Sequence, residues 1–356
     1  MNLKSFRRIV LLTERESTPF LAKTAISMLR YRPKDVLAVL DRHEVGKTAD
    51  QVFNVGGEIP FVDSLDRVED ADSLFIGIAP PGGKLPEAWR PMVVDAIRRG
   101  MAVVSGLHHF LTDDDEFVKL AQKSNAQLVD VRKNDEKETA TGKGLNPGCF
   151  RIHTVGQDCS VGKMVTAIEV QKNLQDRGYD AGFAATGQTG MMIEGQGTPI
   201  DCVVSDFVNG SAERLVKSLD HHEFLVIEGQ GCITHPAYSG VTLGLLHGCA
   251  PDAMVFCYEA TRPHVKGFGE IPLQPIAKLV ELYETVANTR HPSSVVGIAM
   301  NSRLLTDAQY REEKQRLESE LGLPVVDVFR ESADGLVGAI LVRRDQVTEN
   351  REGAIH

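Results

Sequence analysis

The sequence predicts an α/β protein of two domains: an N-terminal Rossmann-like parallel-sheet domain, then a P-loop NTPase-like doubly wound α/β domain. Apolar strand-like segments alternate with helix-like segments along both halves of the chain, which is typical of parallel sheets covered by helices. A polar stretch interrupts this alternation near the middle. A strand, a glycine turn and a helix then follow in the order that phosphate-binding loops require. We expect domains at residues 1–135 and 149–356, joined by a linker at residues 136–148.

The first domain is predicted from short apolar strands separated by helices. The expected strands lie at residues 7–13, 35–41, 59–64, 73–79, 101–106 and 127–132. The expected helices lie at residues 20–31, 89–100 and 113–124, and the last begins with acidic residues that favour a helix N-terminus. Ligand sites in such sheets form at the carboxyl ends of strands.

Two loops of the first domain fall at such strand ends. Residues 79–86 hold two prolines and two glycines but lack the GxGxxG pattern, so they form either a weak dinucleotide site or a proline-stiffened turn. His108 and His109 follow the strand at residues 101–106. They have no metal-ligand partner at helical spacing, and we interpret them as loop residues.

Residues 133–148 contain almost no large apolar side chain. Such a composition is typical of a domain linker or a mobile lid, and we place the start of the second domain near Asn146.

The second domain alternates in the same way. Its expected strands lie at residues 152–155, 181–187, 224–228, 252–260, 293–301 and 323–329. Its expected helices follow the phosphate loop and lie further on at residues 211–219, 240–248, 272–290, 306–322 and 335–344. A glycine turn at residues 187–190 and a long loop to Phe207 are expected after its second strand. This pattern predicts a doubly wound sheet.

Composition excludes several classes of protein. The chain of 356 residues carries a net charge of −10 and a pI of about 5.6, which argues against a surface for nucleic acid or anionic membranes. No apolar run is long enough to span a bilayer, and the N-terminus is typical of a first strand and not of a signal peptide. The six cysteines form no CxxC pair, which argues against a zinc or disulfide framework and favours a reducing cytoplasm. We expect small-molecule partners.

The phosphate loop is the most specific motif of the sequence. The predicted contacts to a phosphate come from the glycine turn and its flanking residues: Gly156, Asp158, Cys159, Ser160, Val161, Gly162, Lys163 and Met164. Glycines allow backbone N–H groups to turn towards an anion, and the helix N-terminus adds its positive dipole end. Lys163 supplies a full positive charge. Cys159 is either a reactive thiol, because a helix N-terminus lowers thiol pKa values, or a small residue that fits the turn.

This loop departs from the usual pattern in two ways. Five residues, not four, separate Gly156 from the Gly162-Lys163 pair. Met164 replaces the usual Ser or Thr, and a thioether is a poor ligand for Mg²⁺. A phosphate site is therefore predicted, with an Mg-nucleotide hydrolase less favoured.

Candidate catalytic residues follow the strands near this loop. Glu228 ends an apolar strand, where P-loop folds place an acid that faces the phosphates. His235 is either a general base or a turn residue. Glu194 is a further candidate base, since Glu-Gly-Gln-Gly occurs at both 194 and 228. Gln230, in the second of these corners, is expected to contact the substrate.

A basic cluster follows the strand at residues 252–260. Arg262, His264 and Lys266 are either ligands for substrate carboxylates or a solvated basic loop.

These motifs carry a family resemblance. GQDCSVGK followed by LVIEGQG resembles dethiobiotin synthetase. The whole chain, through APPGGKLPEAWRP, SGLHHFLTDD, TGQTG, DFVNG and IEGQGCITHPAYSGVTLGLLHG, more closely resembles a two-domain bacterial and archaeal family. That family was long described only as a domain of unknown function, and its members include D-glutamate N-acetyltransferase.

The resemblance implies an N-acetyltransferase that uses acetyl-CoA as co-substrate, requires no metal and acts on D-glutamate in D-amino-acid catabolism. The phosphate loop would bind a phosphate of acetyl-CoA, for which Met164 is acceptable. Arg262 and Lys266 would hold the substrate carboxylates. Glu228, Glu194 or His235 would deprotonate the amine, and N–H groups of residues 229–231 would stabilise the oxyanion.

Two other functions compete with this one. The first is an ATP- and Mg²⁺-dependent ligase or kinase resembling dethiobiotin synthetase, against which Met164 argues. The second is a nucleotide sensor without catalytic activity.

Apolar strands near the edges of a sheet need cover. This need favours a homo-oligomer, either a dimer or a tetramer.

Overall fold

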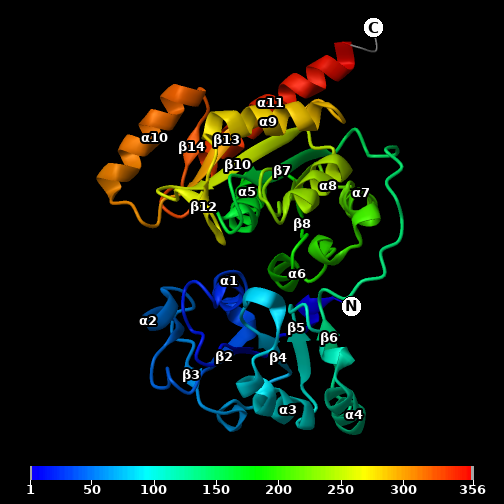
Figure 1. Cartoon of the computed structure of the whole chain (residues 1–356), viewed down its shortest axis with the longest axis vertical. Helices are drawn as coiled ribbons and strands as arrows, with labels where there is room; N and C mark the ends of the chain where they lie inside the picture. The colour runs from blue at the N-terminus through cyan, green and yellow to red at the C-terminus, as the bar shows by residue number, and fades with distance from the viewer. Residues whose placement is uncertain (1, 354–356) are drawn as a thin grey trace. The chain divides into compact units, whose positions relative to one another are not determined.

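Two six-stranded parallel sheets form from the alternating segments, as predicted (Figure 1). The computed structural model describes residues 2–353. Its contacts divide the chain into two units. The first comprises the chain up to Asn134 together with Gln188–Cys202, and the second comprises Asp135–Gly187 and the chain from Val203 onwards.

The sheet of the first unit has the strand order β3-β2-β1-β4-β5-β6. Its strands are β1 Ile9–Leu12, β2 Val36–Leu40, β3 Phe61–Val62, β4 Ser73–Ile76, β5 Ala102–Ser105 and β6 Leu128–Asp130. Strands β2 and β3 are added on one side of β1, and β4, β5 and β6 are added on the other side. The boundary between β1 and β4 is therefore the switch point of a Rossmann-like sheet. The predicted fold class of this unit is therefore confirmed.

Helices and short 3-10 turns connect these strands. The helices are α1 Lys23–Tyr31, α2 Ala49–Phe53, α3 Arg90–Arg98, α4 Asp115–Ser124 and α6 Gln188–Glu194. The 3-10 turns are η1 Leu3–Ser5, η2 Pro33–Asp35, η3 Leu65–Arg67, η4 Pro81–Gly83, η5 Glu87–Trp89, η6 Leu111–Asp113 and η7 Ile200–Cys202. Helix α2 was not predicted because it is only one turn long. A capping box between Thr48 and Gln51 fixes its start.

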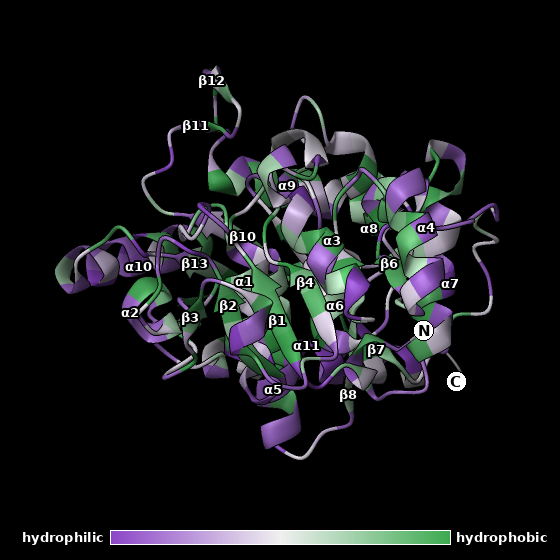
Figure 2. Cartoon of the chain, turned by 90° about the horizontal axis from the view of Figure 1, so that it is seen from below, coloured by the Kyte–Doolittle hydropathy of each residue, from purple (hydrophilic) through white to green (hydrophobic). Residues whose placement is uncertain are grey.

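Strands β1 and β4 are buried along their whole length and appear green, that is apolar, in Figure 2. Trp89 and Phe117 pack in the same core. The indole N–H of Trp89 donates to the carbonyl oxygen of Glu14 at 2.9 Å, so this buried polar group is satisfied. The continuous apolar strands are typical of a sheet covered on both faces.

The sheet of the second unit has the order β14-β13-β10-β7-β9-β8. Its strands are β7 Phe150–Gly156, β8 Ala181–Ala184, β9 Phe224–Ile227, β10 Ala253–Glu259, β13 Ser294–Asn301 and β14 Val325–Val326. Its helices are α5 Lys163–Asp176, α7 Val208–Leu219, α8 Ser239–Cys249, α9 Ile276–Asn288, α10 Asp307–Leu321 and α11 Asp334–Gly353, with a 3-10 turn η8 at Ser205–Phe207. Strand β7 lies between β10 and β9, so the phosphate loop begins at the middle of this sheet.

A short antiparallel hairpin was not predicted. Strands β11 His264–Val265 and β12 Phe268–Pro272 pair with each other outside the main sheet. All five residues of β12 are exposed, so the hairpin lacks the buried apolar alternation by which a strand is found in a sequence.

Residues 188–202 differ most from the expectation of a long loop within the second domain. They form α6 and η7 and pack within the first unit. The main-chain oxygen of Met192 accepts from the buried guanidinium of Arg32 at 2.8 Å, and the hydroxyls of Thr24 and Thr189 lie 2.9 Å apart. The buried apolar residues of α6 explain this packing.

The polar connecting segment is fastened along α7. The carboxylate of Glu213 accepts from the backbone N–H groups of Thr141 at 3.1 Å and Gly142 at 2.7 Å, and Glu136 forms an ion pair with Arg214. A Cβ at Gly210 would lie 1.9 Å from the carbonyl oxygen of Glu138, so only glycine allows this close approach. The segment is therefore packed against the second unit.

Within the described residues, none of the helices combines the length and the apolar character needed to cross a bilayer.

Candidate functional site

The phosphate loop connects β7 to α5, as predicted. All seven residues of β7 are buried, and Lys163 is the first residue of α5. A Cβ at Gly156 would lie 2.6 Å from the carbonyl oxygen of Cys257 on the neighbouring strand. Gly162 has a φ of 114°, a conformation that favours glycine. Both glycines of the motif are thus required by the backbone.

The ammonium group of Lys163 folds back over the loop. Its Nζ donates to the carbonyl oxygen of Asp158 at 2.7 Å, and the residue is only 6% exposed. This contact places a full positive charge beside the N-terminus of α5, where the helix dipole already favours anions.

Asp158 anchors a second segment to the loop. Its completely buried carboxylate accepts from Nη1 of Arg262 at 2.9 Å and from the backbone N–H of Lys266 at 2.7 Å. It also accepts from the backbone N–H of Cys159 at 2.7 Å. The segment from Arg262 to Lys266, which includes β11, is therefore fixed against the phosphate loop.

Arg262 and Lys266 contact the phosphate loop directly. Arg262 donates to the carbonyl oxygen of Cys159 at 2.8 Å, and Nζ of Lys266 lies 2.9 Å from the hydroxyl oxygen of Ser160. Arg262 also forms an ion pair with Glu259. Both cations of the predicted basic cluster therefore lie at the phosphate loop.

Burial raises the pKa of Cys159, and this effect exceeds the opposing effect of the Lys163 charge. The thiol form is therefore favoured, in contrast to the lowered pKa on which the reactive interpretation of Cys159 depends.

Glu228 is held at the end of β9 beside the loop. One oxygen of its buried carboxylate, Oε2, accepts from the backbone N–H groups of Thr186 at 2.9 Å and Gly187 at 3.0 Å. The next residue, Gly229, has no room for a side chain, because its Cβ would lie 1.6 Å from the carbonyl oxygen of Thr154 and 3.1 Å from Cδ of Lys163. The residue that follows the predicted acid thus packs against the stem of the predicted phosphate lysine.

Gln230 continues this corner. Its side-chain Nε2 donates to the hydroxyl of Thr186 at 3.2 Å, and its main-chain carbonyl oxygen accepts from the hydroxyl of Thr242 at 2.8 Å. The side chain therefore supports the turn that also holds Glu228.

His235 is buried next to Asp158, near the carboxylate oxygen that Arg262 does not contact. Its Nδ1 accepts from the backbone N–H of Ala237 at 3.1 Å, so a neutral ring carries its proton on Nε2. Nε2 lies 3.7 Å from the Asp158 carboxylate and, among the described residues, has no hydrogen-bond partner. This tautomer is suited to donating a hydrogen bond rather than to accepting a proton.

Glu194 lies in the first unit, at the end of α6, where its carboxylate forms an ion pair of 3.2 Å with Lys4. The two Glu-Gly-Gln-Gly corners therefore belong to different units.

Tyr283 on α9 was not predicted as a site residue. Its hydroxyl donates to the carbonyl oxygen of Gly156 at 2.9 Å and accepts from the backbone N–H of Ile233 at 3.0 Å. Burial raises its pKa well above the usual value. The residue lies on the apolar face of a predicted helix, so nothing in the sequence distinguishes it from a core residue.

A cavity of about 400 Å³ adjoins the loop. Gln157 and Arg262 line it next to the loop, and Leu273 and Ile276 add apolar surface. The cavity is large enough for part of a ligand whose phosphate is bound by the loop.

Comparison with known proteins assigns both parts of the chain. Residues 138–337 match a family described as "Domain of unknown function (DUF1611_C) P-loop domain", and residues 42–134 match "Domain of unknown function (DUF1611_N) Rossmann-like domain". The chain belongs to the DUF1611 family. The predicted family resemblance is therefore confirmed.

Two curated relatives are similar to this DUF1611 protein, both named D-glutamate N-acetyltransferase. The one from Tritonibacter scottomollicae is 37% identical over 90% of this chain and 94% of its own length. The one from Pseudoalteromonas sp is 42% identical over 75% of this chain and 80% of its own length. These relatives make the DUF1611 protein an enzyme of the acyltransferase class, an N-acetyltransferase.

The crystal structure of a DUF1611 family protein from Anabaena variabilis has the same fold. It is 34% identical, with a TM-score of 0.89 over 94% of this chain and 99% of its own length.

Proposed function

We propose that this DUF1611 protein transfers the acetyl group of acetyl-CoA to the amino group of D-glutamate, and that it acts in D-amino-acid catabolism. The observation that carries the proposal is the similarity to two relatives named for this reaction, each matched over most of its length. The geometry of the phosphate loop fits the co-substrate, because coenzyme A carries phosphate groups.

The donor set around the loop suits such a ligand. Lys163 and the N-terminus of α5 supply positive charge at the end of β7, and Arg262 and Lys266 extend it. We assign all three cations to the phosphates of acetyl-CoA, since all three contact the loop itself. Their charge-assisted hydrogen bonds would supply much of the affinity for the co-substrate.

The proposed reaction requires no metal ion. Met164 occupies the position whose hydroxyl holds Mg²⁺ in other P-loops, and its thioether is unsuited to a hard cation. Acyl transfer from a thioester needs positioning, a base and an oxyanion site, which backbone and side-chain groups can supply.

Glu228 is the proposed base for the substrate ammonium group. Two backbone N–H groups orient its carboxylate, and the next residue, Gly229, packs against the stem of Lys163. His235 is assigned as a hydrogen-bond donor through Nε2, because its Nδ1 already accepts a hydrogen bond from the backbone N–H of Ala237. The expectations of a homo-oligomer and a cytoplasmic location stay part of this proposal.

Release of free thiol from acetyl-CoA tests the function. The purified protein would be assayed without ATP or Mg²⁺ against D-glutamate, L-glutamate and D-aspartate in parallel. We expect release with D-glutamate. No release with any acceptor, together with ATP hydrolysis once Mg²⁺ is added, would instead favour the ligase or kinase.

A further inference from the structure

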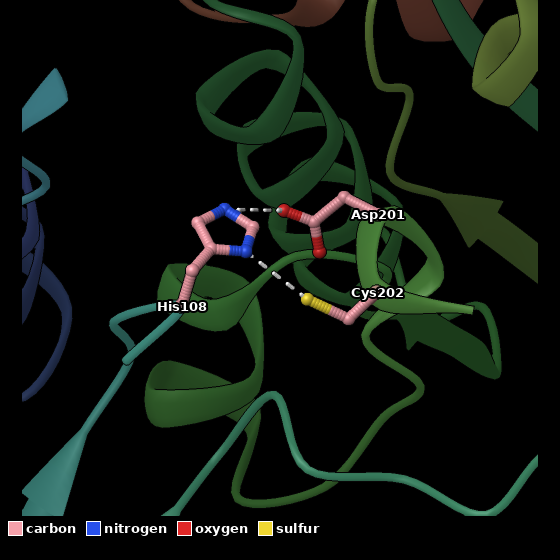
Figure 3. Close-up of side chains that lie close together, drawn as sticks. All are labelled: His108, Asp201 and Cys202. Atoms are coloured by element: carbon pink, nitrogen blue, oxygen red, sulfur yellow. Dashed lines mark hydrogen bonds and ion pairs between the residues drawn. The ribbon is translucent and has the colours of Figure 1, made fainter. Parts of the chain in front are cut away.

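Three side chains with nucleophilic or acid–base chemistry meet within the first unit (Figure 3). His108 lies in the loop after β5, and Asp201 and Cys202 belong to η7. None of them takes part in the phosphate-loop site. Residues 188–202 pack on the first unit, and this packing brings the three together.

The imidazole of His108 faces both other groups (Figure 3). Its Nδ1 is 3.3 Å from Sγ of Cys202, and its Nε2 is 4.0 Å from a carboxylate oxygen of Asp201 (Figure 3). The thiol and the carboxylate thus face opposite nitrogens of one ring. An imidazole with a thiol at one nitrogen and a carboxylate near the other is the arrangement used for general-base activation of a nucleophile.

The carboxylate of the cluster is fixed by a nearly buried arginine. Arg132 donates to one oxygen of Asp201 from two nitrogens, at 3.0 and 2.8 Å, and to Oε1 of Gln188 at 2.7 Å. The other oxygen, Oδ1, is buried and has no hydrogen-bond partner among the described residues. A guanidinium so close to the carboxylate also disfavours a cation there.

The proline-stiffened loop of the sequence positions the histidine. Gly83 has a φ of 61°, and a Cβ on it would lie 2.6 Å from the His108 ring. The backbone N–H of His108 donates to the carbonyl oxygen of Gly83 at 3.0 Å. The glycine therefore allows the loop to lie against one side of the ring, while the His108 side chain stays 48% exposed and accessible to a ligand.

Before any reaction, the thiol of Cys202 and the imidazole of His108 are both favoured in their neutral forms. Burial, followed by the charge of Asp201, raises the pKa of Cys202 to about 11. Burial and the charge of Arg132 lower the pKa of His108. A neutral imidazole with its proton on Nε2, the nitrogen that faces Asp201, presents Nδ1 as an acceptor to the Cys202 thiol, which is the arrangement required for general-base activation during attack.

Building on the proposed acetyl transfer, we propose that Cys202 is a nucleophile that carries the acetyl group between acetyl-CoA and the amine. His108 is its general base, and Asp201 is a positioning residue.

The two half-reactions balance. In the first, the S–H bond of Cys202 breaks, its proton passes to Nδ1 of His108, and Sγ bonds to the acetyl carbonyl carbon. The bond from that carbon to the sulfur of coenzyme A then breaks, and the leaving thiolate takes the proton from His108. In the second, the neutral amine forms the C–N bond, the C–Sγ bond breaks, and the proton of the amine returns through His108 to Cys202.

Exchange of labelled coenzyme A into acetyl-CoA without any amino acceptor tests the first half-reaction. A covalent carrier allows this exchange, and direct transfer to the amine does not. We expect exchange by the unaltered protein, and an added mass of one acetyl group on Cys202 after acid quenching and peptide mapping. Cys202→Ala would abolish both signals and lower turnover roughly 10³-fold or more.

His108→Gln would lower exchange and turnover about 10²- to 10⁴-fold, whereas His109→Gln, at the adjacent exposed histidine, is the matched control and should leave both unchanged. Asp201→Asn should reduce exchange and alter its pH profile, which a merely structural role would not do. Circular dichroism and thermal unfolding confirm that each variant is folded.

The outcomes separate the two proposals. Normal turnover of D-glutamate by Cys202→Ala, or turnover by the unaltered protein without exchange, would overturn the nucleophile and leave the acetyltransferase standing. Exchange that depends on Cys202, without acetylation of D-glutamate, would support the nucleophile and refute the proposed acceptor.

Discussion

The completely buried carboxylate of Asp158 accepts a hydrogen bond of 2.9 Å from Arg262, a residue 104 positions further along the chain. Through this contact, one acid inside the phosphate loop holds the cations that extend it. This contact therefore joins the phosphate loop to the segment before β11.

Asp158→Asn should therefore affect both stability and co-substrate affinity. Removing the charge of Asp158 leaves Arg262 paired with Glu259 but weakens the buried hydrogen bonds from Arg262 and the backbone N–H of Lys266, which we expect to cost about 1–3 kcal/mol in the free energy of unfolding. The KM for acetyl-CoA should rise because Arg262 and Lys266 lose their anchor. Urea unfolding and steady-state kinetics measure the two effects.

Asp307→Asn is the matched control, since Asp307 pairs with Arg330 while 80% of its side chain is exposed. Equal stability losses for the two variants would contradict the anchoring role of Asp158.

Lys163→Ala should raise the KM for acetyl-CoA. Loss of a charge-assisted hydrogen bond costs about 1.5–3 kcal/mol, which corresponds to roughly 10- to 100-fold in affinity. Lys172→Ala, on the exposed face of the same helix, should change nothing. Initial rates over a range of acetyl-CoA concentrations measure this effect, and an unchanged constant would remove Lys163 from co-substrate binding.

Lys266→Ala separates the two roles considered for the basic cluster. Because its Nζ lies 2.9 Å from the hydroxyl oxygen of Ser160, we expect the KM for acetyl-CoA to rise more than the KM for D-glutamate. Varying each substrate at saturation of the other measures the two constants. A rise confined to D-glutamate would restore the role of a substrate-carboxylate ligand.

Glu228→Gln should lower turnover by about 10²- to 10⁴-fold with little change in either KM, as expected for loss of a general base. The amide oxygen can still accept from Thr186 and Gly187, so the fold should persist. Glu194→Gln is the comparison, because Glu194 pairs with Lys4 in the other unit. If the Glu194 variant loses turnover and the Glu228 variant does not, the assignment of the base is reversed.

Glu213 predicts an acid-dependent loss of stability. Burial raises its pKa, but hydrogen bonds from Lys217, Thr141 and the backbone outweigh burial and lower the pKa from 4.5 to about 2. The stabilisation is therefore present above the unfolded-state pKa and is lost as pH falls from 4.5 towards 2. Its size at neutral pH is about 3 kcal/mol.

Urea unfolding of Glu213→Gln between pH 7 and pH 2, with the exposed Glu281→Gln as control, measures this effect. Parallel pH dependence of the unaltered protein and the Glu213 variant would refute it.

Much of the fold could be predicted because it is encoded locally. The strand, glycine turn and lysine of the phosphate loop are contiguous, and the alternating apolar segments located the strands of both sheets. The placement of residues 188–202 could not be predicted, because the apolar face of α6 does not specify which unit it covers. The hairpin lacked any buried alternation.

The site was predictable only where one segment carries it. Contacts such as Asp158 with Arg262, Tyr283 with Gly156 and His108 with Cys202 join residues about a hundred positions apart. A single sequence contains no signal for such contacts. Aspartate, arginine, tyrosine, histidine and cysteine also occur commonly at purely structural positions. The composition of the sequence therefore does not reveal these contacts.

The assignment of residues 188–202 to the first unit has a consequence for synthesis on the ribosome. Because Arg132 reaches Gln188 and Arg32 reaches Met192, the first unit lacks part of its packing until these later residues emerge. N-terminal domains generally fold while the rest of the chain is being translated, but this first unit cannot complete its folding until residues 188–202 have been synthesised. The nascent Rossmann-like sheet must wait for β7, α5 and β8 to leave the exit tunnel, and a chaperone that shields it would act during that interval.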